Sequence, residues 1–421
     1  MTYLSSSWAW GTACCGALFS LASDALAQDL RFSPEIAIEL TGFPDDPTFD
    51  EQFQGFTGAI IATGEVAWRN DARTLQMVVE PYLRYDSRDD ERTYTDLRRG
   101  FLRYLGDGWD ITVGADRVFW GVVESVNVVD VINQRDALED ADLDEKLGQP
   151  MLRFSSQTGI GTFDVFYLPY FRERAFPGLE SRGRLPFPVD EDAATFERSG
   201  EETAGDVALR YANRFGGVDL GLSYFYGTAR QPRLDFNPAR GVYEPVYQRQ
   251  RQLGLDIQYT SDAWLLKLEA ARVEIGDDQF IAAVGGFEYT FFDVAASGRD
   301  VGVIAEYLYD GRNQDQSPVT PFDDDLFFGT RITWNDVEDT ELLAGAIIDV
   351  NGGCTPISAQ ANPRVGEKKL VVVQMGGGGA NGGPLFAKFE GGTPLVVPLS
   401  GAFLKRRGRF PLPFCVSTAP P

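Results

Sequence analysis

The chain has 421 residues, of which 43% are hydrophobic and 24% are charged, a composition typical of folded rather than disordered proteins. Its formal net charge is -24 at pH 7, which argues against a nucleic-acid partner because phosphate binding needs a basic face. The chain contains no histidine, so metal sites built on imidazole and histidine-dependent catalytic triads are excluded.

Residues 1–27 have the features of a secretory signal peptide. An apolar stretch, GTACCGALFSLASDALAQ, leads to Ala-Leu-Ala at 25–27, a small-x-small cleavage site. The basic residues that normally precede such a stretch are absent. Cys14 and Cys15 leave a lipoprotein anchor open as an alternative. We therefore expect the mature chain to begin after residue 27 and to be exported into the periplasm.

Alternation of apolar and polar residues with period two dominates residues 28–350. In LQMVVEPYLRYDSR, residues 75–88, every second residue up to Tyr85 is apolar, and the residues between include Glu80 and Arg84. Fifteen such segments occur, many of about ten residues, which is the length of a tilted strand that crosses a bilayer. They cover residues 34–42, 58–69, 74–86, 96–105, 109–120, 151–157, 162–172, 206–214, 218–227, 252–260, 264–274, 279–292, 300–310, 325–335 and 340–350.

Each of these segments has one apolar face and one polar face. Strands of a water-filled membrane barrel have the same two faces, because one face contacts lipid and the other contacts water. Aromatic residues close many of the apolar rows, at the depth where membrane interfaces favour amphipathic rings. These residues are Trp68, Tyr85, Tyr226, Tyr259, Tyr309 and Trp334.

The connections between segments alternate in length. Short turns such as NDAR, GDG, TGIG, FGG and SDA join even to odd segments, and long stretches join odd to even ones, with IGDD as the exception. Outer-membrane barrels have short periplasmic turns and long external loops. The sequence therefore predicts an all-β fold, an antiparallel up-and-down transmembrane β-barrel of about 16–18 strands, with residues 28–350 as the barrel domain. We expect the stretch 121–150 to be an external loop, with an inward-folded constriction as the alternative.

Residues 351–421 break the pattern. This segment carries a net charge of +6 and thirteen glycines, including GGGG at 376–379, whereas the first 350 residues carry a net charge of -30. Fifteen strands would leave the chain one short of an even number, so at least one more strand is expected after residue 350. We interpret the segment as an anomalous Gly/Pro-rich basic tail that represents a frameshifted C-terminal part of the barrel; an authentic divergent tail is the alternative.

Three stretches carry a family resemblance: GADRVFWGVVESVNVVDVINQRD at 114–136, KLGQPMLRF at 146–154 and LPYFRERAFPGLESRGRLPFPVD at 168–190. They resemble porin-like outer-membrane β-barrels of Gram-negative bacteria, including alginate-export-like and uncharacterised proteobacterial families. The resemblance extends over roughly residues 35–350 and implies passage of solutes across the outer membrane. It is specific for the type of barrel and weak for any substrate.

The sequence thus favours an outer-membrane porin-like channel for passive passage of small polar solutes, with an outer-membrane structural or adhesin barrel without an open pore as the alternative. We expect no enzymatic activity, cofactor or metal. The expected partners are outer-membrane lipids and lipopolysaccharide, the barrel-insertion machinery and small solutes; the oligomeric state is open. Charged residues on the polar faces are the candidate pore-lining residues: Glu65, Arg69, Glu80, Arg84, Arg99, Arg103, Asp164, Arg172, Arg210, Arg214, Asp256, Lys267, Glu269, Glu306 and Arg331.

Overall fold

The computed structural model describes residues 30–43, 46–139, 145–320, 322–336 and 340–350, together with the backbone of residues 357–362, 364–365, 368–369, 374–375 and 395–400. The predicted signal peptide, its cleavage site and most of the tail lie outside the described residues.

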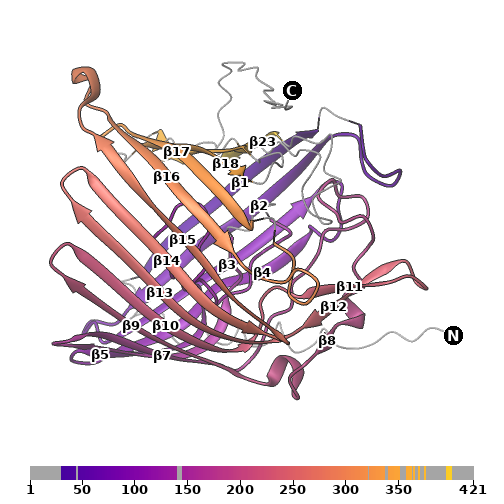
Figure 1. Ribbon diagram of the computed structural model, residues 1–421, viewed down its shortest axis with the longest axis horizontal. Helices are drawn as coiled ribbons and strands as arrows, with labels where there is room; N and C mark the ends of the chain where they lie inside the picture. The colour runs from indigo at the N-terminus through magenta and orange to yellow at the C-terminus, as the bar shows by residue number, and fades with distance from the viewer. Residues whose placement is uncertain are drawn as a thin grey trace.

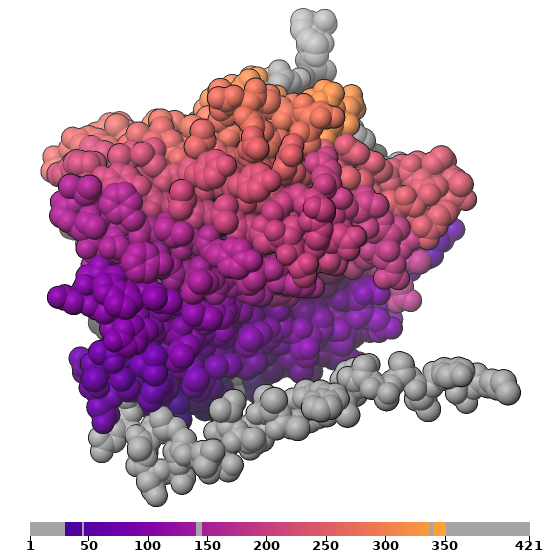
Figure 2. All heavy atoms as spheres, turned by 90° about the horizontal axis from the view of Figure 1, so that it is seen from below, coloured from indigo at the N-terminus to yellow at the C-terminus, as the bar shows by residue number. Residues whose placement is uncertain are grey.

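Every one of the fifteen predicted segments is a β-strand, and each strand is antiparallel to the one it pairs with along the chain (Figure 1). The strands are β1 (Leu30–Phe43), β2 (Gly55–Arg69), β3 (Leu75–Asp86), β4 (Tyr94–Leu105), β5 (Trp109–Asp116), β6 (Gln149–Thr158), β7 (Gly161–Leu168), β9 (Asp206–Phe215), β10 (Val218–Thr228), β13 (Arg249–Ser261), β14 (Trp264–Ile275), β15 (Asp278–Phe291), β16 (Asp300–Asp310), β17 (Asp324–Thr333) and β18 (Glu341–Asp349). The space-filling view shows successive segments as adjacent bands in chain order (Figure 2).

Strands after residue 350 continue the sheet. β19 (Ile357–Asn362) pairs with β18, while β23 (Leu395–Ser400) pairs with β22 (Gln374–Met375) and with β1. The backbones of β19 and β22 approach each other, so the order of strands leads back to the first one. Within the described residues the sheet contains 18 strands, which confirms the predicted antiparallel up-and-down fold and its strand number. The short strands β20 (Arg364–Val365) and β21 (Lys368–Lys369) form a separate pair.

A smaller sheet at the long-loop end was not predicted. β11 (Arg233–Asn237) and β12 (Val242–Tyr247) form a hairpin, and β8 (Thr195–Phe196) pairs parallel to β12. Figure 1 shows this hairpin projecting beyond the ends of the main strands. In the part of the chain that the structure describes, 3-10 turns occur in connections at Glu191–Ala193, Glu201–Thr203 and Val294–Ala296.

The main sheet places apolar side chains outside and polar side chains inside, as the alternation predicts. Leu83 and Tyr85 of β3 are exposed, whereas Arg84 between them is fully buried in the interior. β3 and β4 shift register between Glu80 and Pro81, where the missing proline N–H would interrupt the ladder. No helix in the described part of the chain is long and apolar enough to cross a membrane.

Candidate functional site

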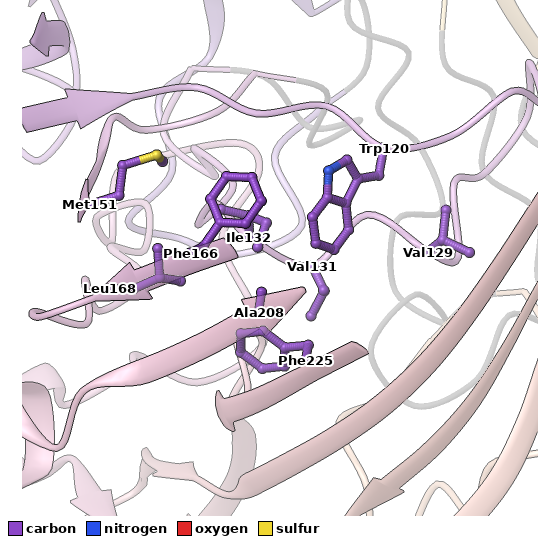
Figure 3. Close-up of a cluster of buried hydrophobic side chains, with 9 residues drawn as sticks. All are labelled: Trp120, Val129, Val131, Ile132, Met151, Phe166, Leu168, Ala208 and Phe225. Atoms are coloured by element: carbon purple, nitrogen blue, oxygen red, sulfur yellow. The ribbon is translucent and has the colours of Figure 1, made fainter. Parts of the chain in front are cut away.

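The connection between β5 and β6 folds into the interior of the sheet. We call residues 117–139 and 145–148 the inner loop. Its Trp120 is 3% exposed, and Val129 and Ile132 are fully buried. These side chains pack against inner-face residues of the wall, among them Phe166 and Phe225 (Figure 3). The expectation of an external loop at 121–150 is therefore wrong, because these apolar side chains are removed from water only inside the barrel.

Glu269 of β14 holds one turn of the inner loop. Its carboxylate accepts hydrogen bonds from the backbone N–H groups of Val122 at 2.7 Å, Val123 at 3.1 Å and Val129 at 3.4 Å. Glu269 is fully buried, so the three N–H groups replace the water that a carboxylate needs. Glu269 therefore fixes the position of the inner-loop backbone in addition to being an interior carboxylate.

Glu306 of β16 holds the next residues in the same way. Its two oxygens accept from the N–H of Glu124 at 2.9 Å, the N–H of Ser125 at 2.8 Å and the Ser125 hydroxyl at 2.6 Å. The Glu124 carboxylate in turn forms ion pairs with Lys267 of β14 and Arg331 of β17. Burial acts to raise the pKa of Glu124, but these two cations outweigh burial and hold the pKa of Glu124 below its usual range.

The other end of the inner loop is tied to the opposite wall through Arg98 of β4. The Arg98 guanidinium contacts Asp136 at 2.6 Å and Glu139 at 2.7 Å, both from the inner loop, and Asp96 at 3.4 Å. Burial raises the pKa of Glu139 to about 7, against the opposing effect of Arg98 and with the support of Glu145. The inner loop therefore spans the interior between the walls formed by β4 and by β14–β16.

On the wall near β1 to β3, charges form compact buried pairs. Arg84 donates to both oxygens of Glu39, at 2.7 and 3.0 Å, and lies 3.6 Å from Asp86. Arg92 contacts the same two carboxylates at 3.5 and 3.4 Å. Arg84 was predicted to line the interior and Glu39 was not, although the place of Glu39 in the alternating row of β1 indicates an inward side chain.

A second group of charges is only partly buried and spans β2 to β5. Arg99 contacts Glu65 at 2.9 Å and Asp116 at 3.2 Å, and lies 4.0 Å from Glu80. Glu80 also accepts from Arg117 of the inner loop at 2.7 Å. Three of the candidate pore-lining residues, Glu65, Glu80 and Arg99, are thus brought together beside the inner loop.

The remaining candidates lie in separate pairs or alone. Each pair joins a candidate residue to an inner-facing partner: Arg103 with Asp110 at 2.7 Å, Asp164 with Arg153 at 3.0 Å, Arg172 with Asp96 at 2.9 Å, and Arg210 with Asp256 at 2.9 Å. Arg214, 3.4 Å from Asp219, and Arg69 are exposed at the short-turn end, away from the inner loop. The structure does not bring these two to the inner loop.

A hollow of 530 Å³ lies between the inner loop and the wall of β13 to β17. Phe119 and Glu124 line it from the loop, and Lys267, Glu288 and Arg331 line it from the wall. Within the described residues, no group of three or more cysteine, aspartate or glutamate side chains is placed to hold a metal ion. The lining of this hollow therefore carries side chains of both charge signs.

The long connections also meet across the mouth at the long-loop end. Residues 178–184, from the connection after β7, contact residues 46–54, from the connection after β1. Phe53 donates its N–H to Glu180 O at 3.1 Å, Gln52 donates to Ser181 O at 3.0 Å, and Arg184 pairs with Glu51 at 2.9 Å. These two connections therefore narrow the opening at the long-loop end of the sheet, outside the inner loop.

No protein-family model matches the chain, and no curated protein matches it. Among solved structures, a BenF-like porin from Pseudomonas fluorescens Pf-5 is 10% identical, with 90% of this chain and 100% of that chain covered and a TM-score of 0.49. OccK11 (OpdR) of Pseudomonas aeruginosa is 11% identical, with 89% and 96% covered and a TM-score of 0.48. OprB of Pseudomonas putida is 11% identical, with 88% and 93% covered and a TM-score of 0.42.

Proposed function

We propose that the chain is an outer-membrane channel for the passive passage of small polar solutes, with the inner loop as its constriction. The observation that carries this proposal is the inner loop itself, held from two walls by Glu269, Glu306 and Arg98 inside a sheet whose outer face is apolar. An apolar exterior suits lipid, and a charged interior suits water and polar solutes. A fixed loop between the walls sets the width of the passage and the charges that line it.

Partly exposed charges beside the inner loop, among them Glu65, Arg99 and Arg331, support passage of polar solutes. Acids and bases face each other there, which creates a field across the passage that sorts polar molecules by their dipole and charge. The other candidate pore-lining residues belong to the same proposal as charges that keep the interior polar. Lipids of the outer membrane would contact the apolar outer rows.

A second candidate function is a structural or adhesin barrel with a closed interior. Buried pairs such as Arg84 with Glu39, and the contacts between connections across the mouth, favour it. These contacts rigidify the molecule whether or not solutes pass.

The experiment that separates the two is single-channel recording of the refolded chain in planar bilayers. Heat-modifiable migration on SDS gels first establishes that the sheet has closed into a folded barrel. A channel gives discrete, salt-dependent conductance steps from that sample. Folded, heat-modifiable protein that inserts without any conductance would instead support the closed barrel.

A further inference from the structure

Two arginines point outward from the long-loop ends of adjacent strands. Arg251 of β13 and Arg272 of β14 have side chains that are 53% and 57% exposed. Both continue the outward rows of their strands, since Arg251 lies two residues from the exposed Leu253 and Arg272 pairs with Leu253 across the ladder. The two strands lie side by side in Figure 1. Two cations are therefore held on one face, at neighbouring positions of the sheet.

Their donors are largely unused. Within the described part of the chain, neither guanidinium donates a hydrogen bond, whereas Arg103 in the interior donates two to Asp110, at 2.7 and 2.9 Å. Both outward arginines share one carboxylate, that of Glu274, at the long distances of 3.8 and 3.6 Å. The guanidinium groups thus remain able to form bidentate hydrogen bonds with an oxyanion.

The arginines also lie at the border of the apolar outer surface. Leu253 and Ile281, which pair with Arg272 from its two sides, are each 55% exposed. On other strands the outward row ends at this border in rings such as Tyr167 and Tyr309. A ligand that contacts both surfaces must carry an anionic head beside apolar chains.

A third cation extends the group. Arg249 is exposed two residues beyond Arg251 on the same outward row, and its backbone N–H donates to Glu197 at 2.9 Å. The guanidinium of Arg251 lies 5.5 Å from the ring centre of Tyr226, which supports the arginine from the neighbouring strand. Three arginines therefore lie together on this surface, beside the carboxylates of Glu197 and Glu274, in a chain whose net charge is -24.

We propose that Arg249, Arg251 and Arg272 bind the phosphate of a phosphorylated glycolipid in the outer leaflet, whose acyl chains lie along Leu253 and Ile281. The site combines two planar guanidinium groups that can each form bidentate hydrogen bonds with a phosphate and an adjacent apolar surface that can contact acyl chains. The inference rests on the proposed function, because it requires the long-loop end of the sheet to lie in the outer leaflet of the outer membrane.

The test is native mass spectrometry of the refolded full chain, titrated in detergent with bisphosphorylated lipid A. The variant carries Arg251→Gln and Arg272→Gln. The matched control carries Arg88→Gln and Arg240→Gln, two exposed arginines of the connections that lie away from the outward rows. Each arginine beside an anionic lipid contributes about a fivefold factor to the affinity. Loss of both arginines therefore predicts roughly 25-fold weaker binding of lipid A by the variant, and we expect little change for the control.

Three results would overturn the inference: equal binding by the variant and the native chain, equal binding of lipid A whose phosphates have been removed, or full displacement of lipid A by inorganic phosphate. The third result would identify a site for free anions instead. Single-channel conductance is recorded on the same samples. Normal conductance without lipid A binding refutes this inference alone, whereas lipid A binding without conductance refutes the channel and leaves the site intact.

Discussion

The hydrogen bonds at Glu306 allow a direct test of how the inner loop is held. Replacing Glu306 by Gln keeps the shape of the side chain and removes its charge. The amide oxygen can still accept from Ser125, but the new NH₂ group then faces the N–H of Glu124, a donor against a donor. One charge-assisted hydrogen bond is lost and one buried donor is left without a partner. Together these changes cost about 2–4 kcal/mol.

A cost of that size raises the population of detached loop by a factor on the order of 100, since each 1.4 kcal/mol is about tenfold. Detachment widens the passage, so we expect a larger and noisier unitary conductance in planar bilayers. Ser125→Ala, which loses only the hydroxyl bond, should have a smaller effect in the same direction. Asp110→Asn is the matched control, because Asp110 faces the interior and pairs with Arg103 rather than with the loop.

A Glu306→Gln channel whose unitary conductance and current noise equal those of the native chain would show that these hydrogen bonds do not hold the loop in place. Heat-modifiable migration of the same sample shows that the barrel has folded. An equal change in Asp110→Asn would show that loss of any interior carboxylate alters conductance, irrespective of contact with the loop.

Three further predictions concern the wall, the loop and the mouth. Ile257→Arg on the outward row of β13 should reduce the free energy of unfolding by about 2–4 kcal/mol in a bilayer refolding titration, whereas Gln258→Arg on the inward row should cost much less; equal costs would contradict the assignment of faces. Burial raises the pKa of Glu139 from 4.5 to about 7, so the folded state binds more protons than the unfolded state between those values, and stability should fall as pH rises through that window, by up to about 3 kcal/mol. Glu139→Gln should flatten this dependence in unfolding titrations; an unchanged slope would assign it to other groups. The connection after β1 carries the acidic residues Asp46, Asp50 and Glu51 at the mouth. These charges should give a weak cation preference, read from reversal potentials in a KCl gradient, and anion preference would mean that interior arginines dominate.

The strands were predictable from sequence because a membrane barrel requires apolar and polar side chains to alternate with a period of two residues along each spanning strand. Every second residue of a spanning strand must suit lipid, so rows such as Leu253, Leu255 and Ile257 can be read directly from the chain. The hairpin of β11 and β12 is under no such constraint. It lies beyond the membrane-spanning strands, and its strands of five and six residues are only about half as long as the roughly ten-residue segments that identify a spanning strand.

The inner loop was not predictable by the same rule, because alternation says nothing about where irregular backbone folds. The signal that was available is composition: Trp120, Val123, Val129 and Ile132 are too apolar for a solvated external loop. Arg98 was missed for a different reason. The register shift in β3 and β4 brings both Arg98 and its neighbour Arg99 to the interior, which strict alternation forbids.

Glu269 and Glu306, the two glutamates that hold the inner loop, follow it in the chain by 140 to 182 residues. The loop therefore cannot reach its final place until β14 and β16 have been added to the sheet. Contacts between residues so far apart in sequence are slow to form, because the chain loses loop-closure entropy before the contacts contribute stabilising free energy. Sheet formation and interior filling must then proceed together, and protease cleavage within the inner loop should persist until the final third of the barrel has paired. Early protection of the loop during refolding would show that its interior packing precedes those strands.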